Sequence, residues 1–347
     1  MENQLTTPEK KKTLRRRAIY MGAAVILCAV VLRLIFGGTV LMENATLADW
    51  LTWFYTGVVP QQPTEPPTQP PTDPPTDPPT EPPIVKPDPF EIVLPDKVEK
   101  LYLNTSGASF NYEKLLKKPL DWNLTGDAPT VLIVHTHATE GYKNDGQYQE
   151  SDAYNTLDNN YNMIAVGDRL KTLLEAQGIS VIHDRTNHNK DYLKAYQSSR
   201  KSVSEYLEEY PSIQLVLDLH RDAFGANDAE IRQNALTATY NGKKAAKIMF
   251  VVTASGSGNK MPHPNWQQNA AAVFKFRLVL ESIFPGITYK TWVQTAPKHN
   301  YNQHLHPGSM LMEIGAVGNT QQEAFNTMEV LAQAIVKMQG GVKVVKK

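Results

Sequence analysis

The fold is decided by the stretch from Thr130 to Glu140, which reads TVLIVHTHATE. Its residues 131–134 are all apolar and do not alternate with polar residues. Such a run is typical of a strand buried on both faces in a parallel sheet. Two histidines and a glutamate follow this strand directly. Because ligands bind at the carboxyl ends of parallel strands, the stretch predicts a central strand and also the sheet edge where a site would lie.

Outward from this strand, predicted strands and helices alternate to the end of the chain. Further strands are expected at 179–182, 213–219, 288–293 and 309–314, and helices at about 160–177, 192–210, 265–284 and 321–338. The dipeptide Asn241-Gly242 predicts a hairpin between 236–240 and 247–254, which would add antiparallel strands to the sheet. We therefore predict one α/β domain over 130–340, with a mostly parallel or mixed central sheet flanked by helices. Residues 90–129 are expected to form an N-terminal arm that packs on it.

The beginning of the chain has a different composition. Residues 1–17 form a basic tail before an apolar segment, 18–42, which is long enough for a transmembrane helix if Arg33 extends its charged end to the interface. Basic residues stay on the cytoplasmic side, so a single-pass anchor would place the rest of the chain outside the membrane. A cleaved signal peptide fits the same pattern, and both interpretations export the remainder.

A proline-rich segment follows at 60–89, with 14 of the 24 prolines of the chain. It repeats Pro-Pro-Thr followed by Gln, Asp or Glu. Such a segment favours polyproline II at about 3.1 Å per residue, so we expect a stiff spacer up to roughly 90 Å long. A ligand for a proline-binding module is the alternative interpretation.

Composition also excludes several classes of function. The 35 basic and 35 acidic residues cancel, so no overall field recommends nucleic acid as a partner. The single cysteine, Cys28, excludes an intramolecular disulfide and a thiolate metal cluster. Any metal site must therefore use His, Asp or Glu.

Three strand ends carry residues suited to metal chemistry. His137 and Glu140 follow the first strand with His-x-x-Glu spacing, and His220 stands at the tip of another strand. Two histidines and one carboxylate form a catalytic Zn2+ site that leaves one position open for water. Glu313, in the apolar strand 309–314, is then the expected general base.

Other interpretations of these residues remain open. Glu313 could form an internal salt bridge with Arg221, and His-x-x-Glu spacing often occurs by chance. His304 lies in a loop before the strand of Glu313, where it could bind substrate or be simply exposed. The remaining histidines considered, His183, His188, His263 and His299, are expected at the surface.

Three blocks of the sequence resemble the signature blocks of the stage II sporulation protein P family. They are residues 131–142 (VLIVHTHATEGY), 216–223 (VLDLHRDA) and 300–318 (NYNQHLHPGSMLMEIGAVG). The resemblance covers about 130–338, and the anchor and spacer fit the layout of the family. The blocks are specific in combination, although none would suffice alone.

This resemblance implies a peptidoglycan hydrolase, an N-acetylmuramoyl-L-alanine amidase that in some members is also an endopeptidase. It would remove stem peptides from glycan strands during septal thinning and engulfment in sporulation. The implied fold is that of zinc-dependent amidases related to zinc carboxypeptidases. The implied partners are stage II sporulation protein D, a lytic transglycosylase, and a membrane-bound septal component. The implied location is the extracytoplasmic side of the cell membrane at the sporulation septum.

The family residues correspond to the pair His135 and His137, to His220 and to Glu313. We expect His137, Glu140 and His220 to ligate the metal, with His135 beside them or as a substitute ligand. In the broader amidase group the carboxylate ligand follows the first histidine at a longer interval. That spacing would select Glu150 or Asp158 in place of Glu140.

Two other functions compete with amide hydrolysis in peptidoglycan. An exported zinc carboxypeptidase would need a cationic group for the terminal carboxylate, and Arg221 is a candidate for binding substrate in this way. A catalytically inert wall-binding scaffold at the septum is the other alternative. It is disfavoured because His137, Glu140, His220 and Glu313 are all present.

Overall fold

The computed structural model describes residues 88–94, 96, 102–104, 111–120, 122–143, 154–223, 236–255, 261–294 and 300–345. All of them belong to one compact unit, Pro82–Lys347. The predicted tail and anchor (1–42), the spacer except for residues 88 and 89, Glu150 and His299 lie outside the described residues. In the described part of the chain, none of the helices is both long enough and apolar enough to cross a membrane.

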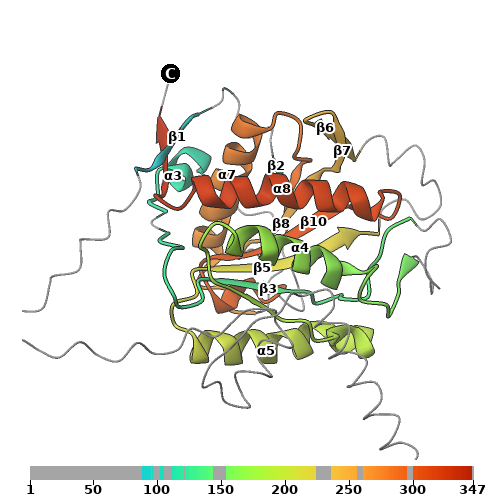
Figure 1. Cartoon of the computed structure of the whole chain (residues 1–347). Helices are drawn as coiled ribbons and strands as arrows, with labels where there is room; N and C mark the ends of the chain where they lie inside the picture. The colour runs from blue at the N-terminus through green and yellow to red at the C-terminus, as the bar shows by residue number, and fades with distance from the viewer. Residues whose placement is uncertain are drawn as a thin grey trace, which may run out of the picture. The chain divides into compact units, whose positions relative to one another are not determined.

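A seven-stranded mixed sheet forms the centre of the domain (Figure 1), in the strand order β2-β9-β8-β10-β5-β3-β4. The strands are β2 (Tyr102–Asn104), β3 (Val131–Val134), β4 (Val181–His183), β5 (Leu215–Asp222), β8 (Ile248–Thr253), β9 (Thr291–Gln294) and β10 (Ser309–Ala316). The pair β8 and β10 is antiparallel and the other neighbours are parallel. The predicted α/β class with a mixed sheet is confirmed.

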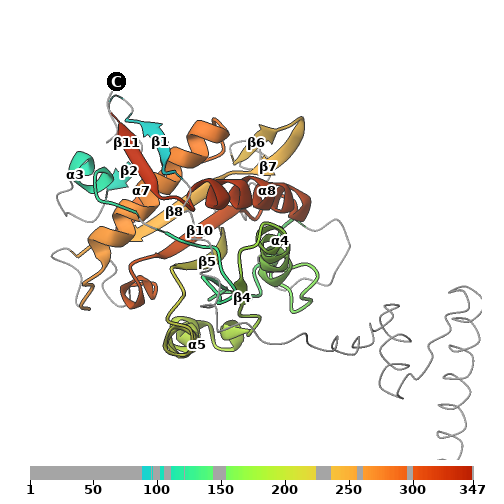
Figure 2. The ribbon, with the colours of Figure 1, turned by 60° about the vertical axis from the view of Figure 1, so that its left-hand side comes forward.

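Helices cover both faces of this sheet (Figure 2). The helices α4 (Met163–Glu175), α7 (Trp266–Ile283) and α8 (Gln321–Lys337) lie on one face, and α5 (Ala195–Glu209) lies on the other. Local sequence sets their ends. Asn162 caps α4 by accepting from Ile164 N, and Gly178 follows α4 with a φ of 75°, a conformation that glycine adopts without strain. Thr320 and Glu323 form a capping box at the start of α8.

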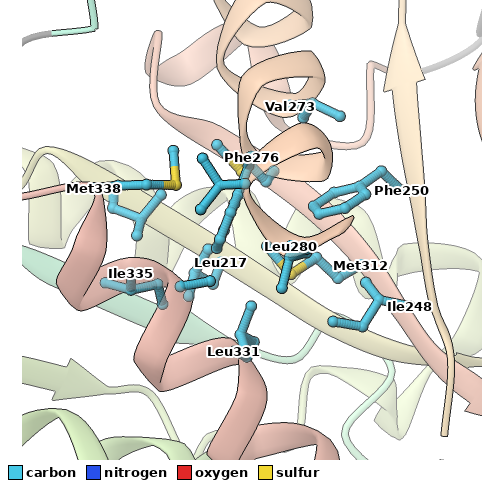
Figure 3. Close-up of a cluster of buried hydrophobic side chains, with 14 of the residues drawn as sticks. Leu217, Ile248, Phe250, Val273, Phe276, Leu280, Met312, Leu331, Ile335 and Met338 are labelled. Atoms are coloured by element: carbon cyan, nitrogen blue, oxygen red, sulfur yellow. The ribbon is translucent and has the colours of Figure 1, made fainter. Parts of the chain in front are cut away.

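Alternate residues of the central strands point to opposite faces, which divides the core in two. Val131 and Ile133 of β3 contribute to the larger cluster, with residues of α4, α7 and α8, while Leu132 and Val134 pack with Val203 of α5. Figure 3 shows the larger cluster, where Leu217 of β5 and Met312 of β10 meet side chains of α7 and α8. Burial on both faces explains the unbroken apolar run of β3.

The hairpin at Asn241-Gly242 forms with a different partner strand from the one predicted. β6 (Thr237–Tyr240) pairs with β7 (Lys243–Ala246) in a separate two-stranded sheet. The strand predicted at 247–254 is β8, which joins the central sheet between β9 and β10. The prediction was wrong because β7, KKAA, has no apolar run that marks it as a strand.

Smaller elements complete the unit. β1 (Phe90–Val93) pairs with β11 (Val342–Val345) in a second small sheet, and α3 (Tyr112–Leu116) lies between β2 and β3 in the chain. The predicted helix at 192–210 starts as the 3-10 turn η4 (Tyr192–Lys194), preceded by η3 (His188–Lys190). A third 3-10 turn, η5 (Gln303–Leu305), precedes β10.

Candidate active site

The carboxyl ends of β3, β5 and β10 bring the four predicted chemical residues together. Because β5 and β10 are parallel, His220 and Glu313 are direct partners in the register of the two strands. The rings of His137 and His220 lie 5.4 Å apart, measured between centroids, and His220 Nδ1 is 3.6 Å from Glu140 Oε2. Side chains up to 176 positions apart in the chain (Glu313 and His137) thus share one sheet edge.

Hydrogen bonds from neighbouring backbone hold Glu140. Its Oε2 accepts from the backbone N–H of Arg221 at 3.0 Å. Arg221 is buried, and its Nε donates to the carbonyl of Gly141 at 2.6 Å. Arg221 therefore ties the turn that carries Glu140 to the end of β5.

The ring of His137 is oriented by two neighbours. Its Nδ1 lies 3.0 Å from Asn189 Oδ1, while Asn189 Nδ2 donates to Thr139 Oγ1 at 2.7 Å. With the amide oxygen facing the ring, Nδ1 is the donor and Nε2 keeps its lone pair. Tyr192 stacks on the same ring, with 4.7 Å between centroids and 15° between planes. His137 is therefore pre-oriented with one nitrogen available as a ligand.

Carboxylates surround His220. Burial alone would lower its pKa, but Asp218, Glu140 and Glu313 raise the pKa of His220 to about 10. Asp218 also accepts from Thr136, through the backbone N–H at 2.9 Å and through Oγ1 at 2.7 Å. The edge of the sheet is thus a place that strongly favours positive charge.

Glu313 is the least satisfied of these groups. Its Oε2 is buried and has no hydrogen-bond partner among the described residues. Burial raises the pKa of Glu313, and the negative charges of Glu140 and Asp222 raise it further. A buried carboxyl with an open oxygen and a raised pKa is suited to receive a proton from a reacting group.

The donor set fits a divalent metal ion such as Zn2+. No group of three His, Cys, Asp or Glu side chains in the described part of the chain is already arranged to hold one. Two imidazoles and a carboxylate nevertheless meet here, which is the ligand chemistry of catalytic zinc. His220 Nε2 is 2.9 Å from Asp218 Oδ1, so the carboxylate of Asp218 holds the ring of His220 in place.

The other predicted site residues lie in different settings. Asp158 is exposed, and its carboxylate accepts from the backbone and side chain of Asn160. His304 is half-buried on η5, and its Nδ1 has no hydrogen-bond partner in the described residues. Its loop borders the site through Tyr301, whose ring packs on Tyr196 at 5.2 Å. Tyr196 in turn lies parallel to His220, with 6.3 Å between centroids.

The prediction of surface positions for His183, His188 and His263 was wrong. All three rings are buried and bonded: His183 to His135, His188 to Asp184 and His263 to Thr253. Sequence reasoning missed His183 because its partner His135 is 48 positions away, whereas Asp184 lies four positions before His188 and was a local signal that was passed over. It also passed over Asp218, although a carboxylate inside the apolar run LVLDL was a visible signal of a buried, bonded group.

Comparison with known proteins places this arrangement in a family. Residues 85–336 match the family model of stage II sporulation protein P. The chain belongs to this family. A curated stage II sporulation protein P from Bacillus subtilis is 30% identical over 223 residues, which are 62% of this chain and 52% of that protein. The chain thus matches about half the length of this member of the stage II sporulation protein P family.

Solved structures of cell-wall amidases show a weaker similarity. The CwlD amidase of Clostridioides difficile, in complex with the GerS lipoprotein, is 16% identical over 60% of this chain and 96% of that chain, with a TM-score of 0.36. The N-acetylmuramyl-L-alanine amidase of Mycobacterium smegmatis is 11% identical over 63% of this chain and 99% of that chain, also at 0.36. Scores of this size carry no argument about chemistry, which has to come from the residues.

Proposed function

We propose that the chain hydrolyses the amide between N-acetylmuramic acid and L-alanine in peptidoglycan, as a zinc enzyme. The observation that carries the proposal is the meeting of His137, Glu140, His220 and Glu313 at one sheet edge, where Glu313 Oε2 has no hydrogen-bond partner among the described residues. Membership of a sporulation family supports peptidoglycan as the substrate. Cleavage of stem-peptide cross-links is a further activity that the same site could support.

His137, Glu140 and His220 would hold the metal. Bound Zn2+ supplies a Lewis acid that polarises the scissile carbonyl and lowers the pKa of a water molecule. Asn189 and Tyr192 hold the ring of His137, and the backbone of Arg221 holds the carboxylate of Glu140. These contacts support the proposal because they restrain the side chains of His137 and Glu140, as outer-shell partners of metal ligands do.

Glu313 would act as the general base and then as the acid. It takes a proton at Oε2 from the attacking water and delivers it to the nitrogen of the leaving amine. Burial supports this role because it raises the pKa of Glu313 toward the range in which a carboxyl both accepts and returns protons. The nearby positive charge of His220 lowers the pKa of Glu313 and so opposes the effect of burial. A cation bound at the site would act on the pKa of Glu313 in the same direction.

The rest of the chain supports a membrane-anchored enzyme outside the cell membrane. Residues 18–42 would be the anchor and 60–89 the spacer that carries the hydrolase to the wall of the sporulation septum. Stage II sporulation protein D and a membrane-bound septal component are the proposed partners. His304, on the loop beside the site, is proposed to contact the substrate. The buried Arg221 bonds Gly141, so the carboxypeptidase alternative gains no support from it.

The test compares the purified full-length chain with Glu313→Gln and Glu329→Gln. Zinc content is measured by elemental analysis, and peptide release from purified peptidoglycan by muropeptide analysis. We expect about one zinc per chain in all three proteins. Glu313→Gln should lose activity by about 10²–10⁴-fold, the usual contribution of a general acid–base group.

Glu329→Gln is the matched control, because Glu329 is a carboxylate on α8 that pairs with Arg169, a half-exposed side chain, away from the site. It should retain full activity. If the wild type holds no zinc and releases no peptide even with its partner protein added, the amidase proposal fails and a wall-binding scaffold replaces it.

A further inference from the structure

Four polar groups are linked in a row by hydrogen bonds behind the candidate active site. The row does not include Glu313 Oε2, the unpaired atom of that site. It runs from Asp168 Oδ1 to His183 Nδ1 at 3.0 Å, then from His183 Nε2 to His135 Nε2 at 2.9 Å. It ends where His135 Nδ1 meets the carbonyl oxygen of Leu219 at 3.0 Å. The two rings are buried and stand edge-to-face, 5.0 Å apart.

The partners determine the direction of each hydrogen bond. A carbonyl oxygen only accepts, so His135 Nδ1 carries the proton and His135 Nε2 presents a lone pair. His183 Nε2 then donates to His135, while Nδ1, which faces Asp168, donates as well only when His183 is an imidazolium. Burial lowers the pKa of His183, and the carboxylate of Asp168 is the main group that opposes this effect. Asp168 also pairs with Arg185 at the surface.

Gly167 of α4 leaves room for the two rings. A Cβ on Gly167 would lie 2.4 Å from His183 Nε2 and 2.5 Å from His135 Nε2. Such separations are shorter than any van der Waals contact, so a side chain here would force the rings apart. The residue next to Gly167 is Asp168, so one turn of α4 supplies both the space and the acceptor.

This chain of contacts extends the β3–β5 pairing beyond its backbone ladder. The last residues paired in that ladder are Val134 and Asp218. His135 and Leu219 are the next residues, and the ring of His135 bonds the carbonyl of Leu219. His137 follows His135 by two positions, and His220 follows Leu219 directly. The position of His135 thus sets the separation of two proposed metal ligands.

We propose that His183, held by Asp168, is a positioning residue of the active site. It fixes the orientation of His135 through Nε2, while the Leu219 carbonyl sets the tautomer, and His135 joins the ends of β3 and β5 and so spaces His137 and His220. His135 is then a structural partner of the site and not a metal ligand, because both of its nitrogens are already bonded. The inference rests on the proposed metal function of His137 and His220.

The test measures the full-length chain with His183→Phe, which removes both ring nitrogens, and His183→Gln, which retains a donor near the Nε2 position. Zinc affinity is measured by chelator competition. The hydrogen bond at His135 Nε2 is measured by 15N NMR of the ring nitrogens. We expect His183→Phe to weaken zinc binding about tenfold or more, the usual cost of losing an outer-shell partner, and to shift the His135 signals. His183→Gln should recover part of both effects.

Thr130→Val is the matched control for the loss of a buried hydrogen bond. Thr130 precedes β3 at its other end, where its Oγ1 donates to Leu124 O at 2.8 Å. It should lower the melting temperature without changing zinc affinity or the His135 spectrum. The proposal is overturned if His183→Phe leaves the 15N signals of His135 unchanged and the zinc affinity within twofold of the wild type.

Failure of the proposed function gives a different result. A wild-type chain that binds no zinc would refute the metal role of His137 and His220, and with it the positioning role of His183. The His135 spectrum would still show whether the hydrogen-bonded chain exists. The two failures are therefore distinguishable in one set of samples.

Discussion

His135 and His137 stand two residues apart at the end of the same strand, yet the structure places them in opposite situations. Both nitrogens of His135 are bonded, one to a backbone carbonyl and one to a second histidine. His137 is bonded at Nδ1 only and lies beside His220 and the carboxylates around it. The two-residue spacing brings both side chains to the same edge of the sheet. The hydrogen bonds around each ring then determine which ring has a nitrogen left for a ligand, and on this basis we assign that role to His137.

The largest expected effect separates these two histidines directly. His137→Ala should reduce zinc content from about one per chain to near zero, since a catalytic site has only three protein ligands to lose. His135→Ala should retain zinc at saturating concentration but bind it about 10–100-fold more weakly. Elemental analysis and chelator competition measure the two effects, and equal loss in both variants would contradict the division of roles.

The next effect concerns the carboxylate beside His220. Asp218→Asn should weaken zinc binding by about 10–100-fold, because Asp218 lies 2.9 Å from His220 and anchors Thr136. Asp184→Asn is the matched control, since Asp184 is a buried aspartate at the same distance from His188.

Both substitutions in this aspartate comparison should lower thermal stability, and only Asp218→Asn should change zinc affinity. The outcome that would contradict the comparison is a zinc defect of similar size in Asp184→Asn.

A smaller effect is expected from filling the space at α4. Gly167→Ala should cost about 1–3 kcal/mol of unfolding free energy, the usual range for overpacking, because its Cβ would collide with two rings. Chemical denaturation measures this cost. Gly178→Ala, where a Cβ meets nothing within 4 Å, serves as a control for the loss of glycine itself, although its φ of 75° adds strain. An unchanged His135 spectrum in Gly167→Ala would show that the two rings can adapt.

The smallest effect should come from the ring that stacks on His137. Tyr192→Ala removes a contact worth about 0.5–1.5 kcal/mol, so zinc affinity should fall only several-fold. Tyr289→Ala is the control, because Tyr289 is also partly exposed but lies before β9. If both variants behave alike, the stacking does not orient His137.

Much of the fold could be predicted because the central elements have unbroken apolar runs or a clear helical period. The apolar run of β3 and the periodic pattern of α8 identify themselves without tertiary information. β7 could not be found, since a KKAA strand forms only because β6 and the turn at Asn241-Gly242 present a partner. Whether a segment without an apolar run forms a strand depends on its neighbours more than on its own residues.

From the sequence alone one could predict the class of fold and the arrival of His137, Glu140, His220 and Glu313 at one sheet edge, where we propose that the chemistry occurs. This is possible because strand ends in a parallel sheet share one edge, whatever their separation in the chain. Only the tertiary structure decided that His135 is bound to His183 and that Glu313 keeps an open oxygen. Those facts depend on which donors and acceptors other elements bring within 3 Å, and no local pattern in the sequence contains that information.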